Sequence, residues 1–104
     1  MKLIALSTLA AAGLMFSAQG LADQPLAKKS GCTNCHAANM TIVGPSFQDI
    51  AKKYAGDASA EAKLEAKVKN GGGGAWGDVP MPPNGHVKDE DIKTLVKLIL
   101  AGGK

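Results

Sequence analysis

The 104-residue sequence contains no arginine and few aromatic residues: one tryptophan, one tyrosine and two phenylalanines. Without arginine, and with no run of more than two lysines, the chain lacks the basic patches that bind nucleic acid. A short chain with so few large side chains has difficulty burying enough apolar surface to fold alone. We therefore expect a cofactor or a covalent cross-link to complete the hydrophobic core.

The N-terminal segment has the features of an export signal. Lys2 is its lone charged residue, and an apolar stretch rich in leucine and alanine covers residues 3–16. Small residues then alternate as they do before a signal cleavage point, which we place after Ala22, with Gly20 as the alternative. An uncleaved membrane anchor is the other interpretation, but the apolar run is weak for a spanning helix.

Cleavage after residue 22 would leave 82 residues (104 − 22), which suits one domain. We expect a cleaved signal peptide over 1–22, one domain over 23–104 and a location in the bacterial periplasm, an oxidising compartment. Residues 23–104 carry eleven lysines and nine acids, a net charge of +2. After cleavage we expect no stable membrane insertion and no nucleic-acid partner.

The remainder of the chain has the pattern of an all-α protein whose helices are joined by glycine- and proline-rich loops. No segment shows the alternation of a half-buried strand. Caps, stop signals and apolar spacing predict four helices. They are a short helix over 25–29 ended by Gly31, a helix capped by Ser46 and ended by Gly56, a helix capped by Ser59 and ended by Gly71, and a last helix with Asp89 as its expected cap and Gly102 at its end. The apolar faces of the last three helices supply the predicted core: Phe47, Ile50, Ala51, Tyr54, Ala60, Leu64, Val68, Ile92, Leu95, Val96, Ile99 and Leu100.

Both cysteines of the chain lie in one motif, Cys-Thr-Asn-Cys-His at residues 32–36, and the other histidine is His86. Four chemistries fit this spacing: a redox dithiol, a zinc site, a disulfide and covalent haem attachment. A thioredoxin-like dithiol would need a βαβ unit, which the pattern does not contain. A zinc site would need His86 as the fourth ligand and the adjacent Cys35 and His36 on one ion, which is geometrically awkward.

Haem attachment explains the motif best. A Cys32–Cys35 disulfide would close a very small loop and would add little stability. Cys-x-x-Cys-His directly after an export signal is typical of a c-type haem, in which both thiols bond to the vinyl groups and His36 becomes an axial ligand of the iron. The large apolar disc of a haem would also complete the core.

The second axial position decides between electron transfer and chemistry at an open iron. The candidates are Met40, Met81, His86 or a lysine. Met40 follows the axial histidine too closely to reach the opposite face. Met81 lies 45 residues (81 − 36) after His36, in the Pro-Met-Pro-Pro segment 80–83, whose fixed φ angles give a stiff, extended presentation. We expect Met81 as the ligand, His86 as the alternative and Met40 as a packing residue.

Together these motifs resemble the small class I bacterial cytochromes c of the c-551/c-552 type. The matching segments are GCTNCH, VGPSFQDIAKKYAG, KVKNG, AWGDVPMPPN and the C-terminal amphipathic helix, and they cover nearly all of residues 23–104. The resemblance implies an all-α fold of about four helices wrapped around one covalently bound haem c, with the methionine ligand on a Gly/Pro-rich loop.

The resemblance also implies roles for residues around the haem. The backbone carbonyl of Pro45 would accept a hydrogen bond from the ring of the axial histidine. Asn84 would donate its side-chain amide to the sulfur of Met81. Trp76 would donate its indole N–H to a haem propionate, and Lys67 would lie near the propionates.

The chain departs from this family at several positions. Leu98 stands where a tryptophan is common, Ala27 stands where an aromatic residue is common, and Lys88 replaces a serine cap. The four glycines over 71–74 predict a loop of low rigidity.

The function implied is a non-enzymatic carrier that passes single electrons through the exposed haem edge between respiratory partners. A nitrite reductase, a cytochrome oxidase or a cytochrome peroxidase would be such a partner, and we expect a monomer. Lysines would steer an acidic partner toward a small, transient contact. The expected contact face consists of Thr33, Asn34, Ile42, Val43, Pro82 and Pro83. A haem enzyme or gas sensor with an open sixth site is the rival function.

Expression together with a haem-attachment system should give a coloured protein with a haem absorption spectrum. A colourless protein would leave the zinc or disulfide interpretation of residues 32–36. A visible spectrum of the purified protein decides between these outcomes.

Overall fold

The computed structural model describes the backbone of residues 18–104 and the side chains of residues 23–104. Most of the predicted export signal, residues 1–17, lies outside the described residues. The described part of the chain contains four α-helices and one short 3-10 helix, joined by loops. In chain order they are α1 (Ala18–Lys29), η1 (Cys32–Asn34), α2 (Phe47–Lys53), α3 (Ala60–Asn70) and α4 (Asp89–Leu100).

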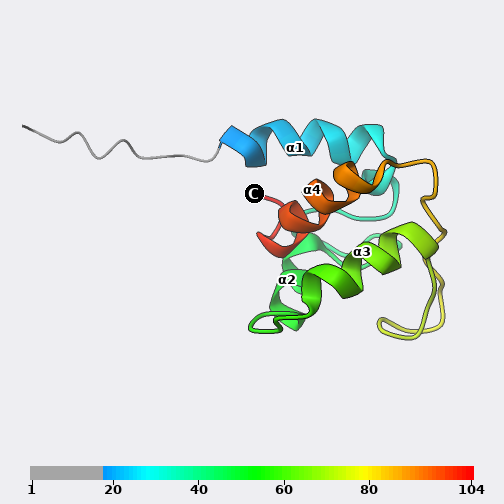
Figure 1. Cartoon of the computed structure of the whole chain (residues 1–104). Coiled ribbons are helices and arrows are strands. Elements are labelled where there is room, and N and C mark those ends of the chain that lie inside the picture. Colours follow the sequence, from blue (N-terminus) through cyan, green and yellow to red (C-terminus); the bar gives the residue numbers. More distant parts are fainter. Residues whose placement is uncertain (1–17) are drawn as a thin grey trace, which may run out of the picture.

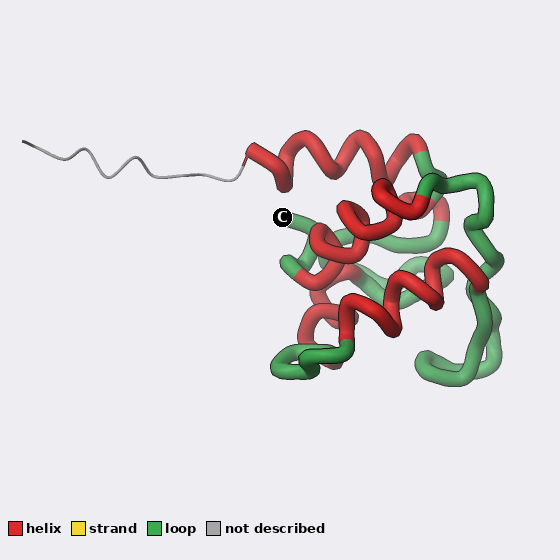
Figure 2. Tube along the Cα trace, viewed as in Figure 1, coloured by secondary structure: helices red, strands yellow, loops and turns green. Residues whose placement is uncertain are grey.

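Residues 18–104 contain no strand, and their β-type pairing consists of two isolated bridges, His36 with Thr41 and Gly72 with Met81. The prediction of an all-α fold is therefore confirmed. Helix α4 is central and contacts α1, α2 and α3 (Figure 1). The longest connection joins α3 to α4 along one side of the molecule (Figure 2). Within the described range, no helix is long and apolar enough to cross a membrane.

Helix α1 extends further toward the N-terminus than the sequence predicts. The prediction starts the helix at Pro25, because proline has no N–H to donate inside a helix. The structure instead places Pro25 within the helix. The predicted boundary is wrong because one proline removes a single donor, while the residues before it can still form helical turns among themselves.

Ser46 caps α2 as predicted. Its Oγ accepts a hydrogen bond from the backbone N–H of Asp49 at 3.0 Å, and the residue is only 2% exposed. The helix ends at Lys53, and its buried face carries Phe47 and Ile50. The cap thus fixes the start of a helix whose buried side chains form part of the core.

Ser59 precedes α3 as predicted, but its side chain makes no capping hydrogen bond to the helix. Asp57 organises this turn instead. Its Oδ1 accepts from the hydroxyl and the backbone N–H of Ser59 at 2.6 and 2.8 Å, and Lys63 donates to its Oδ2 at 3.1 Å. The bonds from Ser59, followed by that from Lys63, lower the pKa of the Asp57 carboxyl to about 2. The predicted cap was wrong because a carboxylate is a stronger acceptor than a hydroxyl.

Helix α4 begins at Asp89, but Asp89 is not its cap. The capping position is Lys88, whose side chain makes no capping bond. The Asp89 carboxylate instead accepts a hydrogen bond from Lys69 of α3 at 2.7 Å, which lowers the pKa of Asp89. Three acidic residues in the first turn still complement the positive end of the helix.

The apolar face of α4 forms the centre of the core, where Leu95 is 1% exposed and Val96 is fully buried. Leu98, which the predicted core omits, is also buried, and it shares a cluster with Leu95 and Ala27. The two departures from the family, Ala27 and Leu98, therefore lie in one contact region between α1 and α4.

Replacing Ser46 by alanine should lower the free energy of unfolding by about 1 kcal/mol, because the N–H of Asp49 loses its acceptor at the start of the helix. Ser59→Ala is the matched control and should change it by less than about 0.5 kcal/mol, since its hydroxyl bonds only to an exposed carboxylate. Denaturant unfolding of both variants measures the difference. Equal losses would contradict the assignment of Ser46 as the cap.

Candidate functional site

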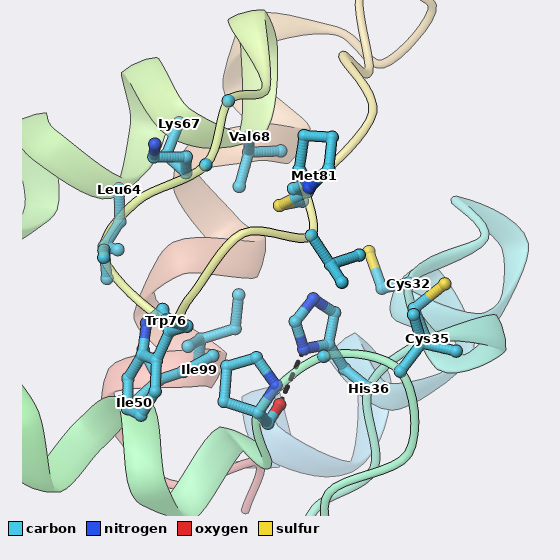
Figure 3. A pocket seen from close by; sticks show the side chains of 18 of the residues that line it. Cys32, Cys35, His36, Ile50, Leu64, Lys67, Val68, Trp76, Met81 and Ile99 are labelled. Carbon is cyan, nitrogen blue, oxygen red and sulfur yellow. Dashed lines mark hydrogen bonds between the residues drawn. The ribbon is translucent and has the colours of Figure 1, made fainter.

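A cavity of about 210 Å³ opens between α2, α3, α4 and the segments that precede α2 and α4. Its walls are mainly apolar, and the formally charged residues among those described that line it are Lys67 and Asp78. Leu64, Lys67 and Val68 lie on the α3 side, and His36 lies on the opposite side (Figure 3). Such a cavity suits a large apolar group with one polar edge.

The two cysteines lie at one edge of this cavity. Helix η1 brings them together, since the backbone N–H groups of Cys35 and His36 both donate to the carbonyl of Cys32, at 3.2 and 2.9 Å. Both thiols are free and partly buried, and burial raises the pKa of the Cys32 thiol. The local turn therefore directs two thiols and one imidazole into the same space.

The imidazole of His36 is held on two sides. Its Nδ1 lies 2.7 Å from the carbonyl oxygen of Pro45 (dashed line in Figure 3). A carbonyl oxygen only accepts, so Nδ1 carries the proton and Nε2 keeps its lone pair for a metal. The ring also stacks on Phe47, with 5.7 Å between ring centroids and an interplanar angle of 21°. The hydrogen bond expected at Pro45 is present in the structure.

Gly44 allows the backbone to approach the imidazole this closely. A Cβ at this position would lie 2.5 Å from Cε1 and 2.9 Å from Nδ1 of His36. The sequence identifies Gly44 as part of a turn but not as a site residue. Its position directly before Pro45 could have identified it. The carbonyl of Pro45 accepts the hydrogen bond from the imidazole, so the residue next to it in the chain must be small.

Met81 lines the same cavity from the loop before α4. It forms a bridge with Gly72, in which each backbone N–H donates to the other residue's carbonyl at 2.9 Å. A Cβ on Gly71 would collide with the carbonyl oxygen of Met81 and would lie 2.8 Å from the nitrogen of Pro83. The first two glycines of the run 71–74 thus join closely packed backbones, which corrects the expectation of a loose loop over all four.

Asn84 does not make the predicted contact with the sulfur of Met81. Its amide nitrogen donates to the carbonyls of Val68 and Pro82, at 3.1 and 3.2 Å, and its backbone N–H also donates to Val68 at 3.0 Å. The loop end lies against the last turn of α3, whose free carbonyls need donors. The amide group therefore bonds the loop to the end of α3 and also to the loop's own carbonyl at Pro82.

Trp76 and Lys67 both line the cavity, where they are expected. Trp76 is 46% exposed, so its ring belongs to the mouth of the cavity rather than to its interior. Lys53, at the end of α2, places its Nζ 4.7 Å from the centroid of the Trp76 ring. The sequence does not identify Lys53 as a residue of this region.

His86 and Met40, the other candidate ligands, do not line the cavity. His86 is exposed, and Met40 is 60% exposed. The expectation that Met40 is a packing residue was wrong, because it lies in the exposed segment 38–43. Among the side chains of residues 23–104, no three His, Cys, Asp or Glu residues are grouped so that they could hold a metal ion.

All six residues of the expected contact face are exposed: Thr33, Asn34, Ile42, Val43, Pro82 and Pro83. Ile42 and Val43 are 52% and 61% exposed, and Val79, which the sequence does not single out, is 70% exposed. Val43 and Val79 also line the cavity, and exposed apolar side chains that gather at a cavity are typical of a contact surface.

Replacing Gly44 by alanine should displace the imidazole from Pro45 and lower the free energy of unfolding by about 1–3 kcal/mol, the usual cost of overpacking. Gly85→Ala is the matched control, since a Cβ there meets no atom within 4 Å. Neither glycine has a positive φ, so backbone strain does not contribute. Equal unfolding energies for the two variants would contradict the packing of Gly44 on His36.

Comparison with known proteins gives consistent matches. A family model described as cytochrome c matches residues 24–102. The chain is 60% identical to cytochrome c-551 of Allochromatium vinosum over 80 residues, 77% of this chain and 85% of that protein. It is 45% identical to cytochrome c-552 of Nitrosomonas europaea over 100 residues, 96% and 97% of the two chains. The crystal structure of wild-type Nitrosomonas europaea cytochrome c552 matches with a TM-score of 0.72 at 47% identity, covering 74% of this chain and 95% of that chain.

The cavity fits the covalently bound haem c of this family. Two free thiols lie at its edge, the Nε2 lone pair of His36 is available beside them, and its walls are mainly apolar. The fold, the cavity and the matches over most of the sequence agree. The chain therefore belongs to the cytochrome c family and is a haem-based electron carrier similar to the bacterial c-551 and c-552 proteins.

Proposed function

We propose that the protein carries single electrons on a haem iron bound by His36 and Met81 from opposite faces. The observation that carries this proposal is that both residues line one cavity together with the cysteine pair. Both ligands are already restrained, His36 by Pro45 and Met81 by its bridge to Gly72. Bound haem supplies the one-electron couple, and filling both axial positions keeps substrates away from the iron.

The surrounding residues then have defined tasks. Cys32 and Cys35 would hold the cofactor in place, their S–H groups adding across its two vinyl groups. The carbonyl of Pro45 orients the imidazole and raises its basicity. The neutral thioether of Met81 favours ferrous iron and raises the reduction potential.

Two residues at the mouth of the cavity are proposed to bind the haem propionates. Trp76 would donate its indole N–H to one of them, and the ammonium group of Lys67 would lie close to their charge. This proposal is supported by the position of both residues on the cavity wall.

We further propose that residues 1–22 are removed on export and that residues 23–104 act in the periplasm. The position of Pro25 supports a cut after Ala22. In a chain that begins at Asp23, this proline would lie in the first helical turn. Backbone N–H groups in that turn have no acceptor within the helix, so a proline there loses no hydrogen bond.

The proposed partners are redox proteins of the periplasmic respiratory chain, such as a nitrite reductase, a cytochrome oxidase or a cytochrome peroxidase. The exposed apolar residues Ile42, Val43, Pro82 and Pro83 would form the contact. Lysines outside this patch would increase the rate of association with an acidic partner at low salt.

Replacing Met81 by alanine should open the sixth position of the iron. The ferric protein should lose its weak near-red sulfur-to-iron band, the ferrous protein should bind carbon monoxide, and the reduction potential should fall by on the order of 0.1 V, within the roughly 0.8 V range set by axial ligands. Visible spectroscopy and redox titration measure these changes.

Met40→Ala is the matched control, because Met40 is 60% exposed and does not line the cavity. It should leave the spectrum, the potential and the lack of carbon monoxide binding unchanged. Ready binding of carbon monoxide by the unaltered protein would contradict the proposal and favour an enzyme or a gas sensor.

A further inference from the structure

Lys53, the last residue of α2, reaches across to the loop that precedes Met81. Its Nζ donates a hydrogen bond to the carbonyl of Ala75 at 3.2 Å and lies 4.7 Å from the centroid of the Trp76 ring. Lys53 does not line the cavity. It therefore belongs to neither the proposed ligands nor the proposed propionate contacts, and it acts on the loop from outside.

The loop that it contacts has few other restraints. Residues 72–80 are all exposed. The bridge between Gly72 and Met81 holds the base of the loop, and a hydrogen bond from the N–H of Gly74 to the carbonyl of Gly77 closes its tip. Within the described residues, the bond from Lys53 is the hydrogen bond that joins segment 73–79 to a helix. Gly72, Gly74 and Gly77 have positive φ angles, and an exposed, glycine-rich segment opens at low energetic cost.

We propose that Lys53 is a positioning residue, a latch that holds Trp76 over the cavity and keeps the loop carrying Met81 closed. The inference rests on the proposed ligation of the iron by Met81. Loss of the latch would increase the fraction of molecules in which the loop, and Met81 with it, has moved away from the cavity.

Both contacts of the latch depend on the positive charge of Lys53. A cation attracts the face of an indole ring, and a charged donor strengthens the bond to a carbonyl. Arginine would preserve both contacts, whereas methionine would keep only the apolar stem. Since Lys53 is exposed, high salt should weaken the attraction in the unaltered protein as well, because the Debye length falls to about 3 Å at 1 M salt.

The experiment compares the unaltered holoprotein with Lys53→Met, Lys53→Arg and Lys52→Met, all with covalently bound haem. Lys52 precedes Lys53 on the same helix and makes no side-chain hydrogen bond or ion pair within the described residues, so Lys52→Met removes the same charge without removing the latch. Two quantities are measured: the fluorescence of Trp76 and the binding of imidazole to the ferric iron.

Trp76 is the only tryptophan in the chain, so the emission reports on this residue alone. A haem quenches the emission of a nearby indole, and release of the ring should therefore increase it. Imidazole competes with Met81 for the iron, and its apparent affinity scales with the fraction of open loops. For Lys53→Met we expect brighter emission and imidazole binding tighter by on the order of threefold to tenfold.

Lys53→Arg and Lys52→Met should match the unaltered protein in both measurements. Salt at 1 M should move the emission of the unaltered protein toward that of Lys53→Met and should leave Lys53→Met itself nearly unchanged. The inference is overturned if Lys53→Met and Lys52→Met give the same emission and the same imidazole affinity.

Failure of the proposed ligation would look different. In that case the unaltered protein would bind imidazole as tightly as Met81→Ala does, whichever residue stands at position 53. An unaltered protein that excludes imidazole, with no effect of Lys53→Met, would remove the latch and keep the proposed function.

Discussion

The hydrogen bond from His36 to the carbonyl of Pro45 is the interaction around which the site is built. It fixes the tautomer of the imidazole and leaves the Nε2 lone pair for the iron. The bond requires the backbone at Gly44 to pass within van der Waals distance of the ring, which excludes any side chain there. Phe47 then stacks against the ring from the start of α2. A buried cap at Ser46 holds that helix end in place, so the orientation of the ring depends on the fold rather than on the haem-binding motif alone.

The loop that carries Met81 combines stiff and permissive residues. Pro80 and Pro82 have fixed φ angles on either side of Met81. Gly71 lets the chain pass close to the carbonyl of Met81, and Gly72 exchanges two backbone hydrogen bonds with Met81. Beyond Gly72 the loop has few backbone contacts, and Lys53 reaches its tip from α2. The base of the loop is thus set by short backbone contacts, and its tip is held by an exposed charge, which salt can weaken. The tip is therefore the part of the Met81 loop with the weakest restraint.

Helix positions were largely predictable because their signals are local. The spacing of Ile92, Leu95, Val96 and Ile99 alone identifies the buried face of α4, and all four are buried. The caps were only partly predictable: the Ser46 side chain caps α2, whereas the Ser59 hydroxyl donates to the carboxylate of Asp57 and makes no capping bond to α3. Asn84 was assigned to the sulfur of Met81 by family resemblance, but its amide satisfies carbonyls at the end of α3 and in its own loop. Met40 was expected to be a packing residue once its closeness to His36 had excluded it as a ligand, but it lies in an exposed segment and is itself 60% exposed.

The kind of cofactor and its candidate ligands can be predicted from local sequence motifs. A Cys-x-x-Cys-His motif and a proline-framed methionine specify a covalent haem and a candidate second ligand, because each depends on neighbours within a few residues along the chain. The contacts that position the histidine and the methionine are visible only in the folded structure. The contacts of Gly44 with His36, of Gly72 with Met81 and of Lys53 with Trp76 join segments whose separation along the chain gives no periodic signal. Such contacts follow from the path of the folded backbone, and glycine and lysine reveal their roles there only once that path is known.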